Sequence, residues 1–319
     1  MKRILVLTDG KAGHENQSKA FVRALGGECE LVGVSFRSRF HKALSYLFDR
    51  IGIRSRSLFR LSREVVVDDG FSAVVGTGSG TFYAVQSTAR RLGVPCGVVL
   101  YPRGYRIGGF DCILAPEFDR PARAPNVIAI PANLVPSDAA FYSAGVDAFS
   151  AHYAHSTGRS LEFDSPAVAV VVGGPNKCST MTASWMRTQL DAVFAAKAPG
   201  GETPRFWVTT SRRTPPEVEA VVASYPWDYM LLYSREKFNP IPAFVALASR
   251  LCVTAESTGM LSEACTSGSA EVVALDNLNP GRHKFRRFIE GLVQGGYVGG
   301  RRKIDLSAAF ARARELMGC

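Results

Sequence analysis

The chain opens with an apolar run, a glycine-containing turn and a helical pattern in direct succession. Residues 4–7 are uninterrupted apolar side chains, which is typical of a strand buried on both faces. Apolar residues at positions 20–22, 24 and 25 follow the spacing of one helix face. The turn between them reads Thr8-Asp9-Gly10-Lys11-Ala12-Gly13-His14-Glu15-Asn16-Gln17. A strand that leads through such a turn into a helix begins a βαβ unit, so the sequence predicts an α/β fold with parallel strands.

This turn is itself a candidate ligand site, because ligands of open α/β sheets bind at the carboxyl ends of the strands. Gly10 and Gly13 allow backbone N–H groups to approach a ligand closely, and a helix start favours an anion. Lys11 and His14 add a cation and an acid–base group that a plain turn does not need. The glycine spacing matches neither the dinucleotide fingerprint nor the P-loop. The alternative is an ordinary turn whose glycines serve only its geometry.

Length and composition exclude several classes of protein. A chain of 319 residues is long enough for two domains, and no apolar run approaches the roughly 18 residues of a membrane span. The seven cysteines are scattered without C-x-x-C spacing, which favours a reducing cytoplasm and neither disulfides nor a zinc site. The absence of an Asp-x-Asp pair argues against one common way of holding a metal–diphosphate complex. We therefore predict no metal site.

The alternation of apolar runs with helical patterns occurs twice along the chain. Strands are predicted at residues 3–8, 30–34, 73–76, 96–100, 112–115 and 127–130, and again at 167–172, 206–210, 229–233, 251–254 and 271–275. Residues 135–165 carry no strand pattern and mark the connection. We therefore predict two Rossmann-like domains, residues 1–150 and 151–319, whose parallel sheets face a central cleft. The last helical pattern, residues 306–317, is expected to pack back on the first domain.

Two turns in the second half carry groups suited to phosphate. Gly173 and Gly174 follow the first strand of that half and permit close backbone approach. Arg212 and Arg213 follow the next strand and are flanked by hydroxyl side chains. The planar fork of arginine matches phosphate oxygens. The alternative for the arginine pair is a solvated basic turn.

A third turn follows the strand at residues 251–254. Ser257 is placed to cap a helix that ends before Gly268. The N–H groups of Ser257, Thr258 and Gly259 would then suit a phosphate. Within that helix, Glu263 could accept hydrogen bonds from ribose hydroxyls, as acids do in nucleotide sites. For Glu256 and Glu263 the alternative is capping and surface solvation, which fits Glu256 better because Glu263 lies among apolar neighbours.

Residues 36–63 form a strongly basic segment. It holds eight Arg or Lys residues against one acid, Asp49, and so carries +7 of the net charge of +10. Within it Phe40, Ala43, Leu44, Leu47, Phe48 and Ile51 follow helical spacing. The pattern favours a helix that packs its apolar face on its own domain with a solvated charged face. The alternative is a surface helix that meets an anionic membrane. No zinc finger, helix-turn-helix or aromatic-studded basic strand supports a nucleic-acid partner.

Long motifs in this sequence resemble those of the mitochondrial fission "elongated mitochondria" family. They are Asp9-Gly10-Lys11-x-Gly13-His14-Glu15-Asn16-Gln17-Ser18, Ser211-Arg212-Arg213-Thr214-Pro215, Asn239-Pro240, and Thr254-x-Glu256-Ser257-x-x-Met260-x-Ser262-Glu263-Ala264. The resemblance covers nearly the whole chain. Two departures are Glu256, where an aspartate is usual, and Gly268-Ser269-Ala270, where a Gly-x-Pro-Val turn is usual.

The resemblance implies a GT-B fold and a glycosyltransferase, the activity ascribed to bacterial members of the family. The second domain would hold a nucleotide-diphosphate sugar as substrate, with no separate cofactor. The residues expected there are Gly173, Gly174, Arg212, Arg213, Glu256, Ser257, Thr258, Gly259, Met260, Ser262 and Glu263. The first domain would be the acceptor side, where Lys11, Gly13 and His14 face the sugar and acceptor, and Gly10 and Gly13 add to the nucleotide-sugar site. The catalytic residues expected there are Lys11, His14 as the base, and Glu15, which orients His14 or acts in its place.

The acceptor and the reaction stay open at this point. A membrane-associated acceptor would account for the basic segment, with the protein cytoplasmic and peripheral on the inner face of the membrane. One alternative keeps the fold and changes the reaction to that of a nucleotide-sugar epimerase or hydrolase. Another is a non-catalytic membrane-division scaffold, which has no need for several polar turns at strand ends.

Overall fold

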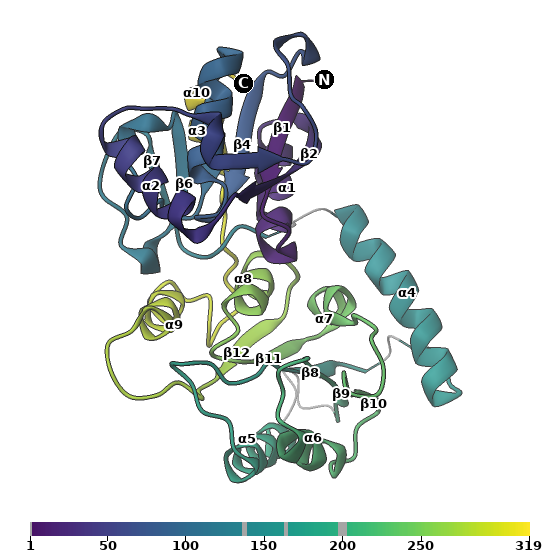
Figure 1. Cartoon of the computed structure of the whole chain (residues 1–319). Helices are drawn as coiled ribbons and strands as arrows, with labels where there is room; N and C mark the ends of the chain where they lie inside the picture. The colour runs from purple at the N-terminus through teal and green to yellow at the C-terminus, as the bar shows by residue number, and fades with distance from the viewer. Residues whose placement is uncertain (1, 136–138, 163–164, 197–202) are drawn as a thin grey trace. The chain divides into compact units, whose positions relative to one another are not determined.

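The computed structural model describes residues 2–135, 139–162, 165–196 and 203–319 (Figure 1). The chain divides into two compact units, residues 1–136 with 305–319, and residues 137–304. Each unit contains one sheet built mainly from parallel strands, as the sequence predicts. Across the described residues, no helix combines the length and the apolar character that a bilayer span requires.

The first unit has seven strands in the order β3-β2-β1-β4-β5-β6-β7. They are β1 (Lys2–Thr8), β2 (Gly27–Phe36), β3 (Phe59–Leu61), β4 (Ala73–Thr77), β5 (Cys96–Val99), β6 (Cys112–Pro116) and β7 (Val127–Ile130). All neighbours pair in parallel except β2 and β3. The helices are α1 (Ala12–Ala24), α2 (Arg39–Arg50), α3 (Phe82–Leu92) and α10 (Ser307–Leu316). Short 3-10 helices are η1 (Arg56–Leu58), η2 (Val67–Asp69), η3 (Ile107–Gly109) and η4 (Glu117–Asp119). Every strand predicted in this half is confirmed, and β3 is additional.

The last helix, α10, belongs to the first unit although it follows the second in the chain. It contacts β6 and β7. Arg314 donates a hydrogen bond of 2.7 Å to the carbonyl oxygen of Ala24, and Arg312 donates one of 3.3 Å to that of Pro125. The two ends of the chain therefore build one unit together, which is the arrangement expected for this helix.

The second unit has five strands, all parallel, in the order β10-β9-β8-β11-β12. They are β8 (Ala167–Val172), β9 (Arg205–Thr210), β10 (Tyr229–Leu231), β11 (Arg250–Thr254) and β12 (Glu271–Leu275). The helices are α4 (Ala139–Thr157), α5 (Ala183–Ala195), α6 (Pro216–Ala223), α7 (Ile241–Leu247), α8 (Thr258–Thr266) and α9 (Lys284–Gln294). Helices α5 and α6 cover one face of the sheet, and α7 and α8 cover the other (Figure 1).

The connection between the units lies earlier than the sequence pattern indicates. The predicted boundary at residue 150 falls inside α4, which belongs to the second unit. The physical reason is an aromatic cluster that the linker interpretation did not foresee. Phe149 of α4 is fully buried against Trp207, Tyr229 and Phe244, with ring centroids 4.8 to 5.6 Å apart. Such contacts add to the burial of large apolar surfaces and fix α4 on the second sheet.

In each unit the strand order reverses beside the first strand of that unit. In the first unit β1 lies between β2 and β4, and in the second β8 lies between β9 and β11. The connections after β1 and β4 therefore leave on opposite sides of the first sheet, and those after β8 and β11 do the same in the second. Each pair of connections flanks a topological switch point. Ligands of open α/β sheets bind at such points.

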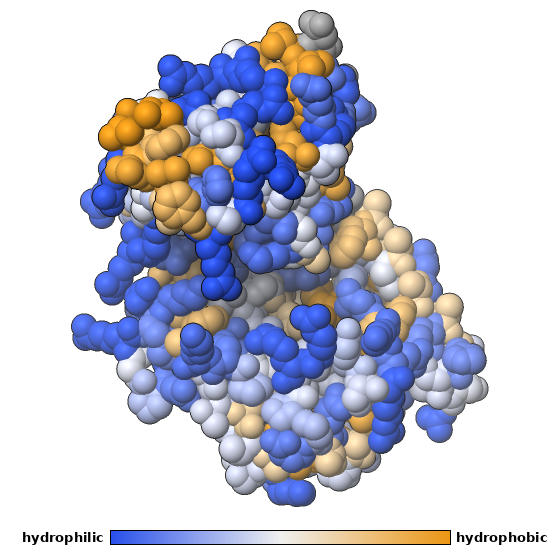
Figure 2. Space-filling model, in the orientation of Figure 1, coloured by the Kyte–Doolittle hydropathy of each residue, from blue (hydrophilic) through white to orange (hydrophobic). Residues whose placement is uncertain are grey.

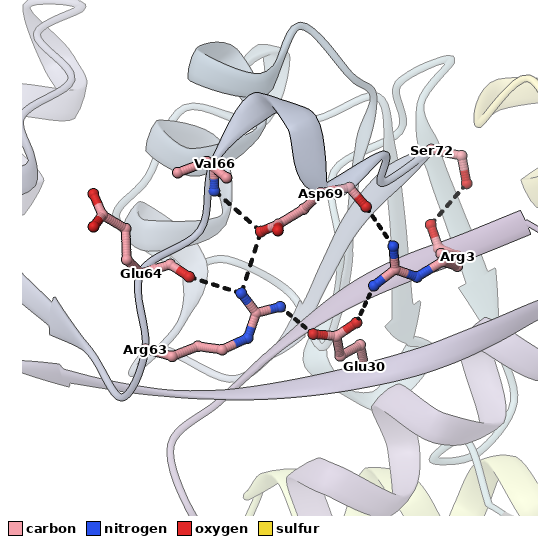
Figure 3. Close-up of polar contacts among 7 residues, drawn as sticks. All are labelled: Arg3, Glu30, Arg63, Glu64, Val66, Asp69 and Ser72. Carbon is pink, nitrogen blue, oxygen red and sulfur yellow. Dashed lines mark hydrogen bonds and ion pairs between the residues drawn. The ribbon is translucent and has the colours of Figure 1, made fainter.

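An ion-pair network joins the amino end of β1 to the loop before β4 (Figure 3). Glu30 pairs with both Arg3 and Arg63, and Arg63 also reaches Asp69 at 3.2 Å. Hydrogen bonds from Arg3 and then Arg63 outweigh partial burial and lower the pKa of Glu30. Two of the chain's many arginines are thus neutralised within the first unit.

Candidate functional site

The first switch point places His14 at the start of a helix. Gly10 has a φ of +77°, a left-handed conformation that turns the chain sharply after β1. Lys11 is the N-cap of α1, so Gly13, His14 and Glu15 lie in the first helical turn. The helix therefore begins well before the apolar pattern that predicts it, because only its later turns bury an apolar face.

Asp9 and His14 form a hydrogen-bonded pair. The two carboxylate oxygens of Asp9 lie 3.0 and 3.1 Å from Nδ1 of His14. Because a carboxylate can only accept, Nδ1 carries the proton and Nε2 of the neutral ring is left as the basic nitrogen. Lys11 donates a further hydrogen bond of 2.8 Å to Asp9. Burial alone would raise the pKa of Asp9, but the hydrogen bonds and charges of Lys11 and His14 lower it overall.

Glycines in the turn after β4 make room for this pair. Gly78 has a φ of +82°, and a Cβ at this position would overlap the imidazole of His14. A Cβ at Gly80 would lie 2.9 Å from the Cβ of Asp9. A buried hydrogen bond of 2.7 Å between Ser18 and Thr77 ties α1 to β4 beside them. The turn after β4 is thus shaped to hold the Asp9–His14 pair.

Glu15 was predicted to orient His14 or to act in its place, and in the structure its carboxylate contacts a different residue. Glu15 forms an ion pair of 2.7 Å with Lys19, one helical turn further along α1. Asp9 contacts the imidazole instead. The sequence signal for Asp9 is an acid directly after the strand and five residues before the histidine.

The second switch point joins the turns after β8 and β11. The N–H of Gly173 donates to Oγ1 of Thr254 at 2.9 Å, and that of Gly174 donates to Oε1 of Glu256 at 2.8 Å. Thr254 in turn donates to Oε1 of Glu256 at 3.0 Å. The two glycine N–H groups that the sequence predicts for phosphate are therefore already bonded within the protein. The prediction that they bind a ligand directly is corrected, and their smallness instead lets the turns approach.

The hydrogen bonds among Gly173, Gly174, Thr254 and Glu256 form a clamp between the two turns. Glu256 is only 3% exposed, and a Cβ on Gly173 would collide with Oε1 of its carboxylate. Its other carboxylate oxygen has no hydrogen-bond partner within the part of the chain that the structure describes. The glutamate side chain is long enough to place this carboxylate on the glycine turn. Glu256 is therefore assigned to holding the turn.

The arginine turn packs directly against the same glycines. Thr214 donates to the carbonyl oxygen of Gly173, and the N–H of Ser211 donates to Thr214 at 2.9 Å. A Cβ on Gly174 would overlap the backbone of Arg213. Both Arg212 and Arg213 are exposed, and neither forms an ion pair among the described residues. Their charges are free to meet an anion.

Arg212 lines a hollow at the carboxyl ends of β9 and β10. The hollow has a volume of about 520 Å³. Its lining includes Ser211, Arg212, Thr214, Tyr233, Ser234 and Arg235. The acid beside it, Glu219, is buried and accepts a hydrogen bond from Thr210. Two exposed arginines, Arg212 and Arg235, thus line the hollow, and the acid in its lining, Glu219, is already hydrogen-bonded.

Helix α8 begins where the sequence predicts, but its first residues do not form the predicted hydrogen bonds. Ser257 precedes the helix, but its side chain makes no capping bond. The N–H groups of Ser257 and Thr258 donate to the carbonyl oxygens of Thr254 and Glu256. Ser262 donates to the carbonyl oxygen of Thr258 at 2.6 Å. Two of the three N–H groups predicted to bind phosphate are therefore used within the turn, while Gly259 is exposed and Met260 half-buried beside them.

Glu263 is the carboxylate of α8, and its surroundings perturb it. It is partly buried, and burial raises its pKa to about 6, although the hydrogen bond from Tyr142 opposes the rise. Tyr142 of α4 donates that bond to Oε1 of Glu263 at 3.3 Å. Tyr142 is not among the predicted site residues, because residues 135–165 carry no strand pattern and were interpreted as the connection between domains. Among the residues described, no three His, Cys, Asp or Glu side chains gather in a group that could hold a metal ion.

Comparisons with solved structures define the class of fold. The chain is similar over its whole length to UDP-GlcNAc 2-epimerase from Methanocaldococcus jannaschii, with a TM-score of 0.52, 9% sequence identity and coverage of 100% of both chains. It is also similar to UDP-GlcNAc 2-epimerase from Neisseria meningitidis bound to UDP-GlcNAc, with a TM-score of 0.50, 11% identity, and coverage of 100% and 98%. The two α/β units with parallel sheets thus have the GT-B fold.

Within that class, the sequence identifies the family. The family model described as "Mitochondrial fission ELM1" matches residues 12–304, so the chain belongs to the mitochondrial fission ELM1 family. It is similar to mitochondrial fission protein ELM1 of Arabidopsis thaliana, with 24% identity over 366 residues that cover 93% of this chain and 84% of that protein. The resemblance inferred from the motifs is confirmed.

Proposed function

We propose that this protein is a glycosyltransferase that transfers a sugar from a nucleoside-diphosphate donor without a metal ion. The observation that carries the proposal is the arginine-bordered hollow at the carboxyl ends of β9 and β10. Its volume of about 520 Å³ lies within the range typical of small-molecule sites. A relative of the same fold was solved with UDP-GlcNAc bound, which supports a nucleotide sugar as the ligand.

In this proposal the second unit holds the donor. Arg212 and Arg213 meet the diphosphate, where negative charge develops as the sugar leaves. The clamp of Gly173, Gly174 and Thr254 sets the position of the arginine turn without touching the ligand. Glu263 accepts hydrogen bonds from the ribose hydroxyls, which favours its ionised form and offsets the effect of burial on its pKa.

The first unit supplies the base. Nε2 of His14 takes the proton from the acceptor hydroxyl as its oxygen bonds to the anomeric carbon and the bond to the diphosphate breaks. Asp9 accepts the Nδ1 proton and stabilises the imidazolium that forms. Lys11 limits the negative charge on Asp9 and lies exposed at the same turn, where it faces the acceptor or the sugar.

A second candidate is a nucleotide-sugar epimerase or hydrolase. The observation that favours it is that both structures compared above are UDP-GlcNAc 2-epimerases. Product analysis with a donor and no acceptor separates the two. Rapid isomerisation or hydrolysis of the sugar supports the second candidate, and a donor that stays intact until an acceptor is added supports the transferase.

The first experiment is a thermal-shift screen of the full chain against a panel of nucleoside-diphosphate sugars. A ligand that binds only the folded protein raises the melting temperature in proportion to the logarithm of its concentration. We expect one nucleotide to raise it and to do so with and without a chelator. If no member of the panel shifts the melting temperature, the proposal fails and a non-catalytic role, as in a division scaffold, takes its place.

A further inference from the structure

Helix α2 presents its apolar face to solvent. Phe40, Leu47 and Ile51 are 71%, 53% and 61% exposed. Together with exposed Ala43 they lie on one side of the helix, at spacings of three and four residues. Figure 2 shows the hydrophobic residues gathered over α2 in the first unit. The sequence-based prediction that this stripe packs on its own domain is therefore wrong for most of its members, and only Leu44 and Phe48 pack against the core.

The inward side of α2 also carries polar groups, and these are hydrogen-bonded. Ser45 and Asp49 are fully buried. Ser45 shares a hydrogen bond of 2.8 Å with the hydroxyl of Tyr105. Asp49 accepts from the N–H of Arg106 at 2.6 Å and pairs with Arg54 at 2.9 Å. Turning the helix to bury its apolar face would leave these groups without partners, so the outward orientation of the stripe is fixed by the core.

Basic side chains without acidic partners lie on α2 and in the segments that flank it. Of the eight in residues 36–63, Lys42 bonds Ser79, Arg54 pairs with Asp49, and Arg63 belongs to the network of Figure 3. The remaining basic residues are Arg37, Arg39, Arg50, Arg56 and Arg60. All are exposed, and none forms an ion pair among the described residues. The only acid of the segment, Asp49, points into the core, so the outer surface carries positive charge alone.

Arginine-lined hollows adjoin both ends of α2. One, of about 520 Å³, is lined by Arg37, Arg56 and Arg60 and lies beside the residues that precede the helix. The other, of about 430 Å³, includes Gly52 just after the helix, with Arg54, Arg56, Arg90 and Arg91. Each hollow can admit an oxyanion group such as a phosphate, which arginine binds through paired hydrogen bonds.

We propose that α2 and its flanking arginines dock this protein on a bilayer that contains anionic phospholipids. Phe40, Leu47 and Ile51 enter the acyl boundary, and the arginines meet the lipid phosphates. A bilayer is the occupant that fits both features, because it offers apolar depth and negative charge side by side. A second copy of this face would bring unpaired arginines together and is disfavoured by charge.

The test is sedimentation of the full chain with phosphatidylcholine vesicles, with and without phosphatidylglycerol. We expect binding only to the anionic vesicles, and weaker binding at high salt. The triple variant Phe40→Ser/Leu47→Ser/Ile51→Ser should lose more than about tenfold in affinity, because it removes most of the inserted apolar area. Arg39→Gln/Arg50→Gln should lose about fivefold for each arginine, or about 25-fold in total.

The matched control is Arg282→Gln/Arg301→Gln, which removes the same charge from exposed positions of the second unit. It should bind vesicles nearly as the wild type does, and circular dichroism should show all variants folded. Equal binding by wild type and the α2 variants, or no binding to anionic vesicles at low salt, would overturn the proposal. So would self-association of the wild type that the triple variant abolishes without any vesicle binding. No nucleotide sugar is present in the assay, so its outcome is independent of the proposed reaction.

Discussion

The Cα of Gly78 faces the imidazole of His14 so closely that a methyl group at position 78 would overlap the ring. Gly78 also has a φ of +82°, a backbone conformation that residues other than glycine rarely adopt. The turn after β4 therefore depends on glycine twice over, once for its backbone and once for the histidine beside it.

Gly78→Ala should therefore displace His14 as well as strain the backbone. Gly93 is the matched control, because its φ is +68° and a Cβ there meets nothing within 4 Å. Both variants should lose about 1 kcal/mol or more of unfolding free energy through strain. Only Gly78→Ala should also lower transferase turnover, by an order of magnitude or more. Denaturant unfolding and steady-state kinetics check this, and equal activity of the two variants would show that His14 does not need its present position.

The Asp9–His14 pair predicts a graded loss of activity. His14→Ala should reduce kcat by about 10²- to 10⁴-fold, the usual contribution of a general base. Asp9→Asn keeps an acceptor near Nδ1 but removes the charge that stabilises the imidazolium, so kcat should fall by a smaller factor with KM little changed. Glu28→Gln, an exposed carboxylate of the same unit, is the control. Turnover of His14→Ala equal to the wild type would remove His14 from catalysis.

Burial of Glu263 predicts a pH-dependent stability. Its pKa of about 6 in the folded protein lies above the ordinary 4.5, so the folded state binds this proton more tightly than the unfolded chain. The contribution of Glu263 to the unfolding free energy is therefore fully present below pH 4.5 and is lost as the pH rises through 6. Glu263→Gln should raise the unfolding free energy at pH 8 by at most about 2 kcal/mol and leave it unchanged near pH 4. The measurement is urea unfolding at the two pH values, and a gain that is the same at both would contradict the assignment.

The clamp between β8 and β11 predicts a local loss of stability. Thr254→Val leaves the N–H of Gly173 without its partner and Glu256 without one donor. Loss of a buried partner costs about 1–3 kcal/mol. Thr209→Val is the control, since Thr209 is also buried in this sheet but makes only one long hydrogen bond of 3.4 Å. Hydrogen exchange should show faster opening at residues 172–174 in Thr254→Val, and exchange equal to that of the control variant would exclude the clamp.

Much of the fold could be predicted from sequence because its strands are buried and parallel. Runs such as residues 167–172 are apolar throughout, and glycine or proline marks their ends. Strand β3 was missed because three residues at an antiparallel edge carry no periodic signal. The start of α1 was missed because its first turn is polar and contains Gly13, which hides the helical pattern.

The direction in which α2 faces could not be predicted, for a different reason. A helical stripe shows that one face is apolar but not which way that face points. Here the outcome depends on the partners of Ser45 and Asp49, and these are Tyr105 and Arg106, far along the chain. The same holds for Glu256, whose role depends on contact with Gly174 across 82 positions of sequence. Only the structure brings such pairs together.

The central claim is that the hollow beside Arg212 binds a nucleoside diphosphate. Isothermal titration calorimetry of the full chain with nucleoside-diphosphate sugars tests it directly. We predict saturable binding of at least one donor, weakened about tenfold or more by Arg212→Ala and unchanged by Arg282→Ala at an exposed position. Absence of binding by every donor, or equal affinities for the two variants, would contradict it.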